Sequence, residues 1–188
     1  MRQIMRNRRR AQGGFTLLDL LVAVTAFSVM LLDAAPLLGV FANTARLARI
    51  SDGLASQIDL AQSEAIRRNV RVVLCKSGDG ASCAATGGWE QGWIVFHDAN
   101  GNGAVDAGET VIARQHALPP AIKLKGDLRA ASYVSFASGG MVLPPIEGTG
   151  SAIFTLCRQW NTGNEARQII LNAVGQPRVE KLRIDSCA

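Results

Sequence analysis

The sequence predicts an α+β protein in which a long N-terminal α-helix, with a transmembrane half and an amphipathic half, packs on a head of antiparallel β-sheet. Three observations lead to this fold class. An apolar run covers residues 15–42, an apolar spacing of three and four continues to residue 69, and short β-rich runs separated by turns fill residues 70–188.

The composition fits one core-bearing domain with an appended segment. The chain has 188 residues, of which 48% are hydrophobic, and this excludes both a disordered chain and a large multi-domain enzyme. The 20 basic residues exceed the 15 acidic ones, but five of the arginines fall within the first ten positions. The rest of the chain is therefore neutral, which excludes a surface that coats nucleic acid through general positive charge.

The apolar run over residues 15–42 predicts a membrane anchor. Its only charged residues are Asp19 and Asp33, and as a helix it would be about 42 Å long, enough to cross a hydrocarbon core of about 30 Å. The arginines precede it, so residues 1–14 should stay in the cytoplasm while the C-terminal part crosses the membrane. An ordinary signal peptide cut near Ala34 is the alternative, and the apolar pattern that continues past this point argues against it.

The start of this run resembles the class III signal of type IV pilins and pseudopilins. The string Gly-Phe-Thr-Leu-Leu-Asp-Leu-Leu-Val-Ala-Val occupies residues 14–24. The resemblance implies that residues 1–14 are a leader, that prepilin peptidase cuts between Gly14 and Phe15, and that the new N-terminus is methylated. Asp19 stands at the fifth mature position, where the family normally has glutamate.

Asp19 also has a physical interpretation. An isolated acid near a membrane core is costly, so Asp19 calls for a partner. In a bundle of such helices its carboxylate can be satisfied by the freed N-terminal ammonium of a neighbour, and this pair would set the axial register between subunits. Aspartate is shorter than glutamate, so its reach toward that amine is reduced.

Residues 43–69 continue the helix with one apolar stripe, which should pack on the β-rich head, residues 70–188. The stripe consists of Leu47, Ile50, Leu54, Ile58, Ala61 and Ala65, and the other side carries Arg46, Arg49, Asp52, Asp59, Glu64, Arg67 and Arg68. In the head, β-rich runs separated by glycine-containing turns predict strands at 70–75, 92–97, 110–114, 122–125, 133–137, 153–158, 167–174 and 178–184.

The four cysteines, Cys75, Cys83, Cys157 and Cys187, all lie in the part that should be exported. Three pairings are possible, and Cys75–Cys83 with Cys157–Cys187 is favoured because the first closes a short turn and the second ties the chain end to an inner strand. A zinc site is disfavoured, since no Cys-x-x-Cys spacing occurs and the only histidines are His97 and His116. Disulfides in turn indicate an oxidising periplasm.

Further strings resemble the H-type minor pseudopilins (GspH) and the FimT/FimU minor pilins. They are Leu-Cys-Lys-Ser at 74–77, Trp-Glu-Gln-Gly-Trp-Ile-Val-Phe at 89–96 and Asp-Ala-Asn-Gly-Asn-Gly at 98–103. The resemblance implies a low-copy subunit that caps or initiates a type II secretion pseudopilus or a type IV pilus. Its partners would be other pilins or pseudopilins, prepilin peptidase and the inner membrane, which the chain would cross once with its head in the periplasm.

An enzyme is not expected, because the two histidines have no evident nucleophilic partner. Trp89, Trp93 and Phe96 are interpreted as core and turn packing.

DNA binding is the alternative function, because some FimT-like proteins bind DNA during natural transformation through a C-terminal Gly-Arg-x-Arg element. That element falls on residues 175–178, where Gln176 replaces the first arginine and only the second arginine, Arg178, matches. Interspersed acids such as Glu165, Glu180 and Asp185 favour an ordinary solvated hairpin. The candidate phosphate contacts are Arg167, Arg178, Lys181 and Arg183, with Trp160 as a stacking surface.

A calcium loop is the one cofactor site that the sequence suggests. Residues 98–109 fit the twelve-position pattern D-x-[DN]-x-[DN]-G-x5-E. Strands rather than helices should flank the loop, and Asn-Gly turns also join hairpins without an ion. The candidate metal ligands are Asp98, Asn100, Asn102, Asp106 and Glu109.

Overall fold

The computed structural model describes residues 16–143, 151–159 and 165–187, with only the backbone described for helix residues 29–43. The chain divides into two units, residues 1–42 and the head unit, residues 43–188. One helix, α1 (Leu17–Arg68), contributes to both units. The short 3₁₀ helix η1 (Trp89–Gln91) lies in the head unit.

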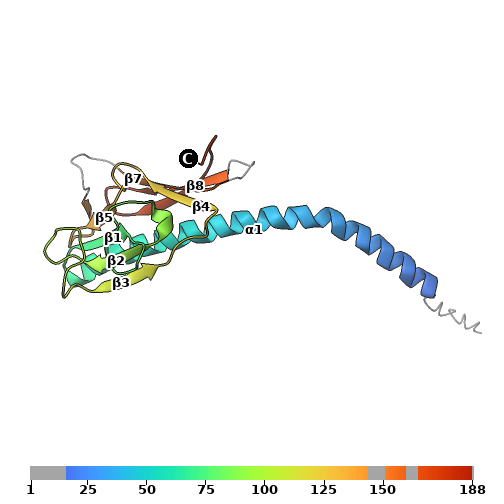
Figure 1. Cartoon of the computed structure of the whole chain (residues 1–188), viewed down its shortest axis with the longest axis horizontal. Helices are drawn as coiled ribbons and strands as arrows, with labels where there is room; N and C mark the ends of the chain where they lie inside the picture. Colours follow the sequence, from blue (N-terminus) through green and yellow to red (C-terminus); the bar gives the residue numbers. More distant parts are fainter. Residues whose placement is uncertain (1–15, 144–150, 160–164, 188) are drawn as a thin grey trace, which may run out of the picture. The chain divides into compact units, whose positions relative to one another are not determined.

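Two antiparallel sheets form the head unit (Figure 1). Sheet A has the strand order β3-β2-β1-β5-β6 and sheet B the order β4-β7-β8-β9. The strands of sheet A are β1 (Val72–Lys76), β2 (Trp93–His97), β3 (Val111–Gln115), β5 (Tyr133–Phe136) and β6 (Val142–Leu143). Those of sheet B are β4 (Ile122–Gly126), β7 (Ala152–Arg158), β8 (Glu165–Leu171) and β9 (Pro177–Arg183).

The predicted apolar stripe of α1 packs against both sheets. Leu54, Ile58, Ala61 and Ala65 are fully buried, and they share one core cluster with side chains from β1, β2, β4, β5, β7 and β8. Helical spacing alone predicts this face, because residues three and four apart lie one above the other. The expected fold class, an α-helix on an antiparallel β-head, is confirmed for the head unit.

Tryptophan side chains fill the space between the helix and the sheets. Trp89 and Trp93 are each 1% exposed, and Trp89 meets Phe154 edge-to-face with ring centroids 5.0 Å apart. The buried indole N–H of Trp89 donates to the carbonyl of Ala130 over 2.7 Å, so this donor is satisfied inside the core. The interpretation of Trp89, Trp93 and Phe96 as packing residues is confirmed.

Sheet A carries a second, smaller core on its other face. Alternation along β1 sends Val73 and Cys75 to this face, where they join Ile94 and Phe96 of β2. Val105, from the loop between β2 and β3, packs over the cluster. The loop that contains the calcium-like pattern is therefore also the cover of an apolar surface.

Two expectations about individual elements need correction. Each predicted strand has a counterpart with shifted ends, but β6 was not expected, because two residues are too few for a periodic signal. Glu64, assigned to the exposed side of the helix, is only 6% exposed. At 100° per residue Glu64 lies at the border of the apolar stripe, where neighbouring segments can cover it.

Candidate functional site

The first turns of α1 present apolar side chains to the surroundings. Seven large apolar side chains between Leu17 and Phe27 are exposed, from 56% to 82%. Among the residues that the structure describes, no helical stretch has both the length and the hydropathy that a membrane crossing requires. The transmembrane expectation for residues 15–42 therefore stays a prediction. The exposed side chains are those of Leu17, Leu18, Leu20, Leu21, Val22, Val24 and Phe27.

Asp19 forms a capping arrangement with Thr16. The backbone N–H and the hydroxyl of Thr16 donate to Oδ2 of Asp19 over 3.0 and 2.8 Å, and the Asp19 N–H donates back to the Thr16 hydroxyl over 3.3 Å. This reciprocal pair satisfies donors at the first turn of the helix. Asp19 thus has a local partner within its own chain, a contact that sequence reasoning missed. The processing residues Gly14 and Phe15 lie outside the described residues.

Both disulfide bonds join the cysteines that the sequence analysis pairs. Cys75 and Cys83 have Cα atoms 5.6 Å apart, and Cys157 and Cys187 have Cα atoms 5.8 Å apart. The first bond closes a loop in which the Ser82 hydroxyl and the N–H groups of Ala81 and Ser82 lower the pKa of Asp79. The second attaches the chain end to β7, an inner strand of sheet B.

The loop over residues 98–109 uses its oxygen atoms in internal hydrogen bonds. The buried carboxylate of Asp98 accepts from the N–H groups of Asn102 and Gly103 and lies 3.1 Å from Nε of Arg71. Glu109 accepts from the N–H groups of Ala99 and Asp106. An arginine thus supplies the positive charge beside the first position of the calcium pattern.

The remaining candidate ligands of this loop also bind one another. The side-chain amides of Asn100 and Asn102 donate to Asp106 over 2.7 and 2.6 Å and lower its pKa. Within the described part of the chain, no three His, Cys, Asp or Glu side chains are grouped closely enough to hold a metal ion. Calcium binding stays a prediction, and the hydrogen bonds of the loop favour the hairpin alternative.

The candidate DNA contacts lie on two faces of sheet B. Arg167 opposes Lys181 in the register of β8 and β9, on the same face as Ile169 of the core, and Arg167 is only 8% exposed. Arg178 opposes Ile170, which points to the other face. The guanidinium of Arg178 lies 2.9 Å from the carboxylate of Glu180.

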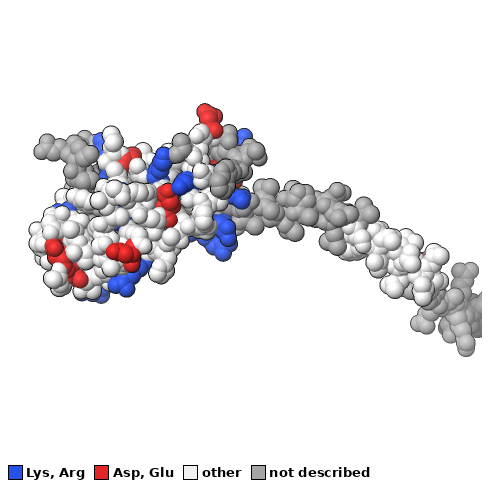
Figure 2. Space-filling model, in the orientation of Figure 1, with Lys and Arg blue, Asp and Glu red and all other residues white. Residues whose placement is uncertain are grey.

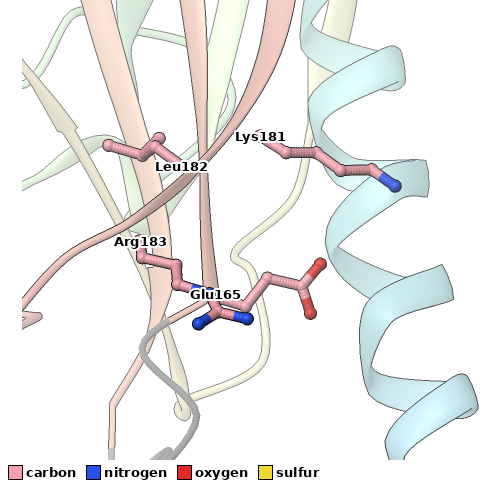
Figure 3. Close-up of a pocket in the computed structure, with 4 residues that line it drawn as sticks. All are labelled: Glu165, Lys181, Leu182 and Arg183. Carbon is pink, nitrogen blue, oxygen red and sulfur yellow. The ribbon is translucent and has the colours of Figure 1, made fainter.

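Arg167 is thus largely buried, and its role as a phosphate contact stays a prediction. Lys181 and Arg183 line an open pocket instead, together with Glu165 and Leu182 (Figure 3). Trp160, the expected stacking surface, lies outside the described residues. Of the two histidines, His116 is exposed and His97 lies close to Glu64.

A charged cluster at the end of α1 was not found by sequence reasoning. Glu64 binds the guanidinium groups of Arg67 and Arg68, and its Oε2 lies 3.7 Å from Nε2 of His97. The hydrogen bond from Arg67, with a further one from Arg68, holds the pKa of Glu64 below its usual range. The sequence did contain a signal for these ion pairs, because Arg67 and Arg68 follow Glu64 by three and four residues on the same helix.

Comparison with known proteins identifies the family of this chain. Residues 51–175 match the family described as Type II transport protein GspH. The chain belongs to the GspH family. The match begins in the head half of α1 and ends in the turn between β8 and β9, so it covers most of the head unit.

Relatives of this GspH-family chain are pilin-like proteins. The pilin-like protein PilA1 of Thermus thermophilus is 29% identical over 171 residues, covering 89% of this chain and 97% of that protein. The crystal structure of the type IV minor pilin FimU of Pseudomonas aeruginosa has a TM-score of 0.57 and 17% identity, covering 79% and 99% of the two chains. The FimU similarity shows a shared fold.

A weaker similarity, with a TM-score of 0.48 and 11% identity, links the chain to the minor pseudopilin EpsH of Vibrio cholerae over 74% of this chain and 98% of that one. The expected resemblance to type IV pilin-like, H-type pseudopilins is confirmed by the family match. Members of this family are structural subunits of type II secretion and type IV pilus systems, and they assemble with other pilins.

Proposed function

We propose that this GspH-family chain is a minor pilin or pseudopilin that co-assembles at the tip of a type II secretion pseudopilus or a type IV pilus, or initiates its assembly. The observation that carries the proposal is the row of exposed apolar side chains along the first turns of α1. An apolar helical surface of this kind needs lipid or other apolar helices around it. The string that resembles a pilin leader, residues 14–24, includes the first residues of this apolar surface.

The proposal assigns the chain to the inner membrane, which it crosses once through residues 15–42 with the head unit in the periplasm. Prepilin peptidase cuts between Gly14 and Phe15 on the cytoplasmic side. The oxidising periplasm is consistent with two disulfide bonds among the described cysteines. No cofactor is needed for this role, and the partners are other pilins or pseudopilins.

Asp19 has two tasks in this proposal. Its hydrogen bonds to Thr16 order the first turn of the helix within one subunit. Its remaining acceptor capacity lets it bind the N-terminal ammonium of a neighbouring subunit during assembly. Both contacts involve the Asp19 carboxylate, so a substitution at Asp19 affects both of them. A substitution at Thr16 affects only the contact within the subunit, and comparing the two variants separates the two tasks.

The test is purification of the full-length protein from native membranes, followed by identification of its mature N-terminus and bound proteins. We expect a methylated Phe15 at the N-terminus and pilin-like partners in the complex. A mature chain that starts near Ala35, or a head unit released as a free monomer, would overturn the proposal.

Matched variants test the role of Asp19. Asp19→Asn keeps the shape of the side chain but removes its charge, so we expect processing to continue and recovery of pilin partners to fall. Thr16→Val removes the local hydroxyl contact but keeps the charge, and partner recovery should be retained. Equal losses in the two variants would show that helix capping, rather than pairing between subunits, explains the effect.

DNA binding is supported less well, because the candidate cations lie on two faces of sheet B and Arg178 is already paired with Glu180. Titration with duplex DNA decides between the two functions. Affinity that falls steeply with salt and is lost in Arg178→Ala would favour the DNA-binding alternative.

A further inference from the structure

At one end of the head unit, a hydrogen bond joins α1 to sheet B. The hydroxyl of Thr44 donates to Oε2 of Glu165, the first residue of β8, over 2.8 Å. In the antiparallel register Glu165 opposes Arg183 at the end of β9, and Ile122 opposes Arg158 at the end of β7. The start of the helix in the head unit and this end of sheet B therefore lie together, and we call them the proximal end.

The proximal end carries an excess of positive charge. Arg46 and Arg49 lie on the first turns of α1 in the head unit, and Lys181 and Arg183 lie at the end of β9. All four side chains are exposed, and none of them forms an ion pair with a carboxylate among the described residues. The carboxylates near them are Glu165, which is bound to Thr44, Asp185, and Asp52, which follows Arg49 by three residues on α1.

At the other end of the head unit, three arginines meet carboxylates. Arg67 and Arg68 bind Glu64, and Arg71 lies 3.1 Å from the buried carboxylate of Asp98. Figure 2 shows several basic side chains where α1 enters the head unit, whereas acidic and basic side chains lie beside one another at the opposite end. The proximal end therefore gathers four unpaired cations, while Arg114 and Lys125 are exposed without an ion pair elsewhere in the described part of the head unit.

A pocket at the proximal end has room for an anionic group. Its volume is about 440 Å³, and it is lined by Glu165, Lys181, Leu182 and Arg183. Lys181 and Arg183 lie on one face of β9, and in Figure 3 the Lys181 and Glu165 side chains extend toward α1. Two cations beside an anchored carboxylate form a polar recess with net positive charge.

Chain connectivity places this charge next to the predicted anchor. The apolar run ends at residue 42, and Arg46 follows after about 6 Å of helical rise. Clusters of Lys and Arg adjacent to a membrane segment bind the negatively charged headgroups of phospholipids. We propose that the proximal end of the head unit docks on anionic phospholipid headgroups of the bilayer that holds residues 15–42, with Lys181 and Arg183 contacting lipid phosphates.

This inference rests on the membrane anchorage in the proposed function. Docking would hold the head unit against the bilayer before the subunit enters a filament, and leaving the membrane would break the contacts of Arg46, Arg49, Lys181 and Arg183. Each Lys or Arg near an anionic surface strengthens such binding about fivefold. Because these contacts are electrostatic and exposed, salt weakens them.

The test uses the full-length chain in nanodiscs made of phosphatidylcholine alone or with about 30% phosphatidylglycerol. Hydrogen–deuterium exchange is followed in peptides covering residues 44–50 and 177–183. We expect slower exchange in the anionic discs at low salt, and this protection should disappear at about 0.5 M salt. Because β9 is an edge strand, its outward-facing N–H groups report directly on docking.

Two variants on the same strand provide the comparison. In Lys181→Gln/Arg183→Gln, loss of two contacts should lower the docking equilibrium about 25-fold. Arg178→Gln removes a charge from the other face of β9, where Glu180 already binds the arginine, and docking should be unchanged. An equal loss in both variants would contradict docking through the proximal end.

Further outcomes separate the possible ligands. Equal exchange in the two kinds of disc overturns the inference and leaves the proposed function intact. Protection by inorganic phosphate as strong as by anionic discs indicates a pocket for free anions, and protection by duplex DNA alone indicates a nucleic-acid site; either result overturns lipid docking. A chain that never inserts into nanodiscs overturns both the anchorage and the docking.

Discussion

The indole N–H of Trp93 donates a hydrogen bond to Oε1 of Gln57 over 2.7 Å, which joins sheet A to the buried side of α1. Trp93 is 1% exposed, so without Gln57 its N–H would lose its acceptor inside the core. We expect Gln57→Leu to lower the free energy of unfolding by about 1–3 kcal/mol. Urea unfolding of the full-length chain in detergent, followed by tryptophan fluorescence, measures the change.

Ser56→Ala is the control for this substitution. Ser56 is the exposed neighbour of Gln57 on the same helix turn, and its hydroxyl bonds only to a backbone carbonyl of that helix. A change within about 0.5 kcal/mol is expected there. If Gln57→Leu were equally mild, the hydrogen bond to Trp93 would not matter for stability.

Glu64 should make stability depend on pH in the acidic range. The hydrogen bond from Arg67, with one from Arg68, lowers the pKa of Glu64 in the folded state. Its contribution is therefore complete above the unfolded-state pKa and is lost as the pH falls through the folded-state pKa. We expect the thermal unfolding temperature of the full-length chain to decrease when the pH is lowered below about 4.5.

Two variants show whether Glu64 causes that drop. Glu64→Gln should be less stable at pH 7 and show a shallower fall in acid, whereas Asp52→Asn, at an exposed position of the same helix, should follow the unsubstituted chain. An unchanged slope in Glu64→Gln would assign the acid sensitivity to other carboxylates.

The two disulfide bonds should contribute unequally to stability. Cys157–Cys187 closes a sequence separation of 30 residues and Cys75–Cys83 one of 8. The loop-entropy estimate gives about 3.6 kcal/mol for the longer loop and about 2.5 kcal/mol for the shorter one. Chemical unfolding of the two paired Cys→Ser variants measures this order, and a larger loss for the short loop would contradict the entropic account.

Calcium should leave the stability of the protein unchanged. In the loop over residues 98–109, Arg71 lies beside Asp98 and the amides of Asn100 and Asn102 donate to Asp106. A bound ion would have to compete with the Arg71 guanidinium for Asp98 and with the two amides for Asp106. We therefore expect the same unfolding midpoint in about 5 mM calcium and in chelator. A rise in midpoint that is lost in Glu109→Gln would restore the calcium interpretation.

Local patterns predicted most of the fold. The stripe that contains Leu54 and Ile58 follows from helical periodicity, and the strands from β-rich runs bounded by turns, because both signals arise within a few adjacent residues. The cysteine pairing followed from spacing and chain position. The exposed apolar residues near Asp19 were also visible in sequence, since nothing polar interrupts them.

The candidate sites were predicted less well, because they depend on contacts between distant segments. Arg167 is of a residue type that commonly contacts phosphate, but the register of β8 places its side chain with Ile169 on the buried face. Asp98 has the spacing of a calcium ligand, but Arg71 lies beside it, supplied by the segment that joins α1 to β1.

The amino-acid sequence by itself determined the helix, its apolar stripe, the strands and the N-terminal signal pattern, since each depends on side chains only a few positions apart. Only the tertiary structure decided that β4 joins sheet B rather than sheet A, which arginines meet carboxylates, and which cations stay unpaired at the proximal end among the described residues. Strand pairing and register act across long sequence separations, and a shift of one residue would move every side chain of a strand to the other face.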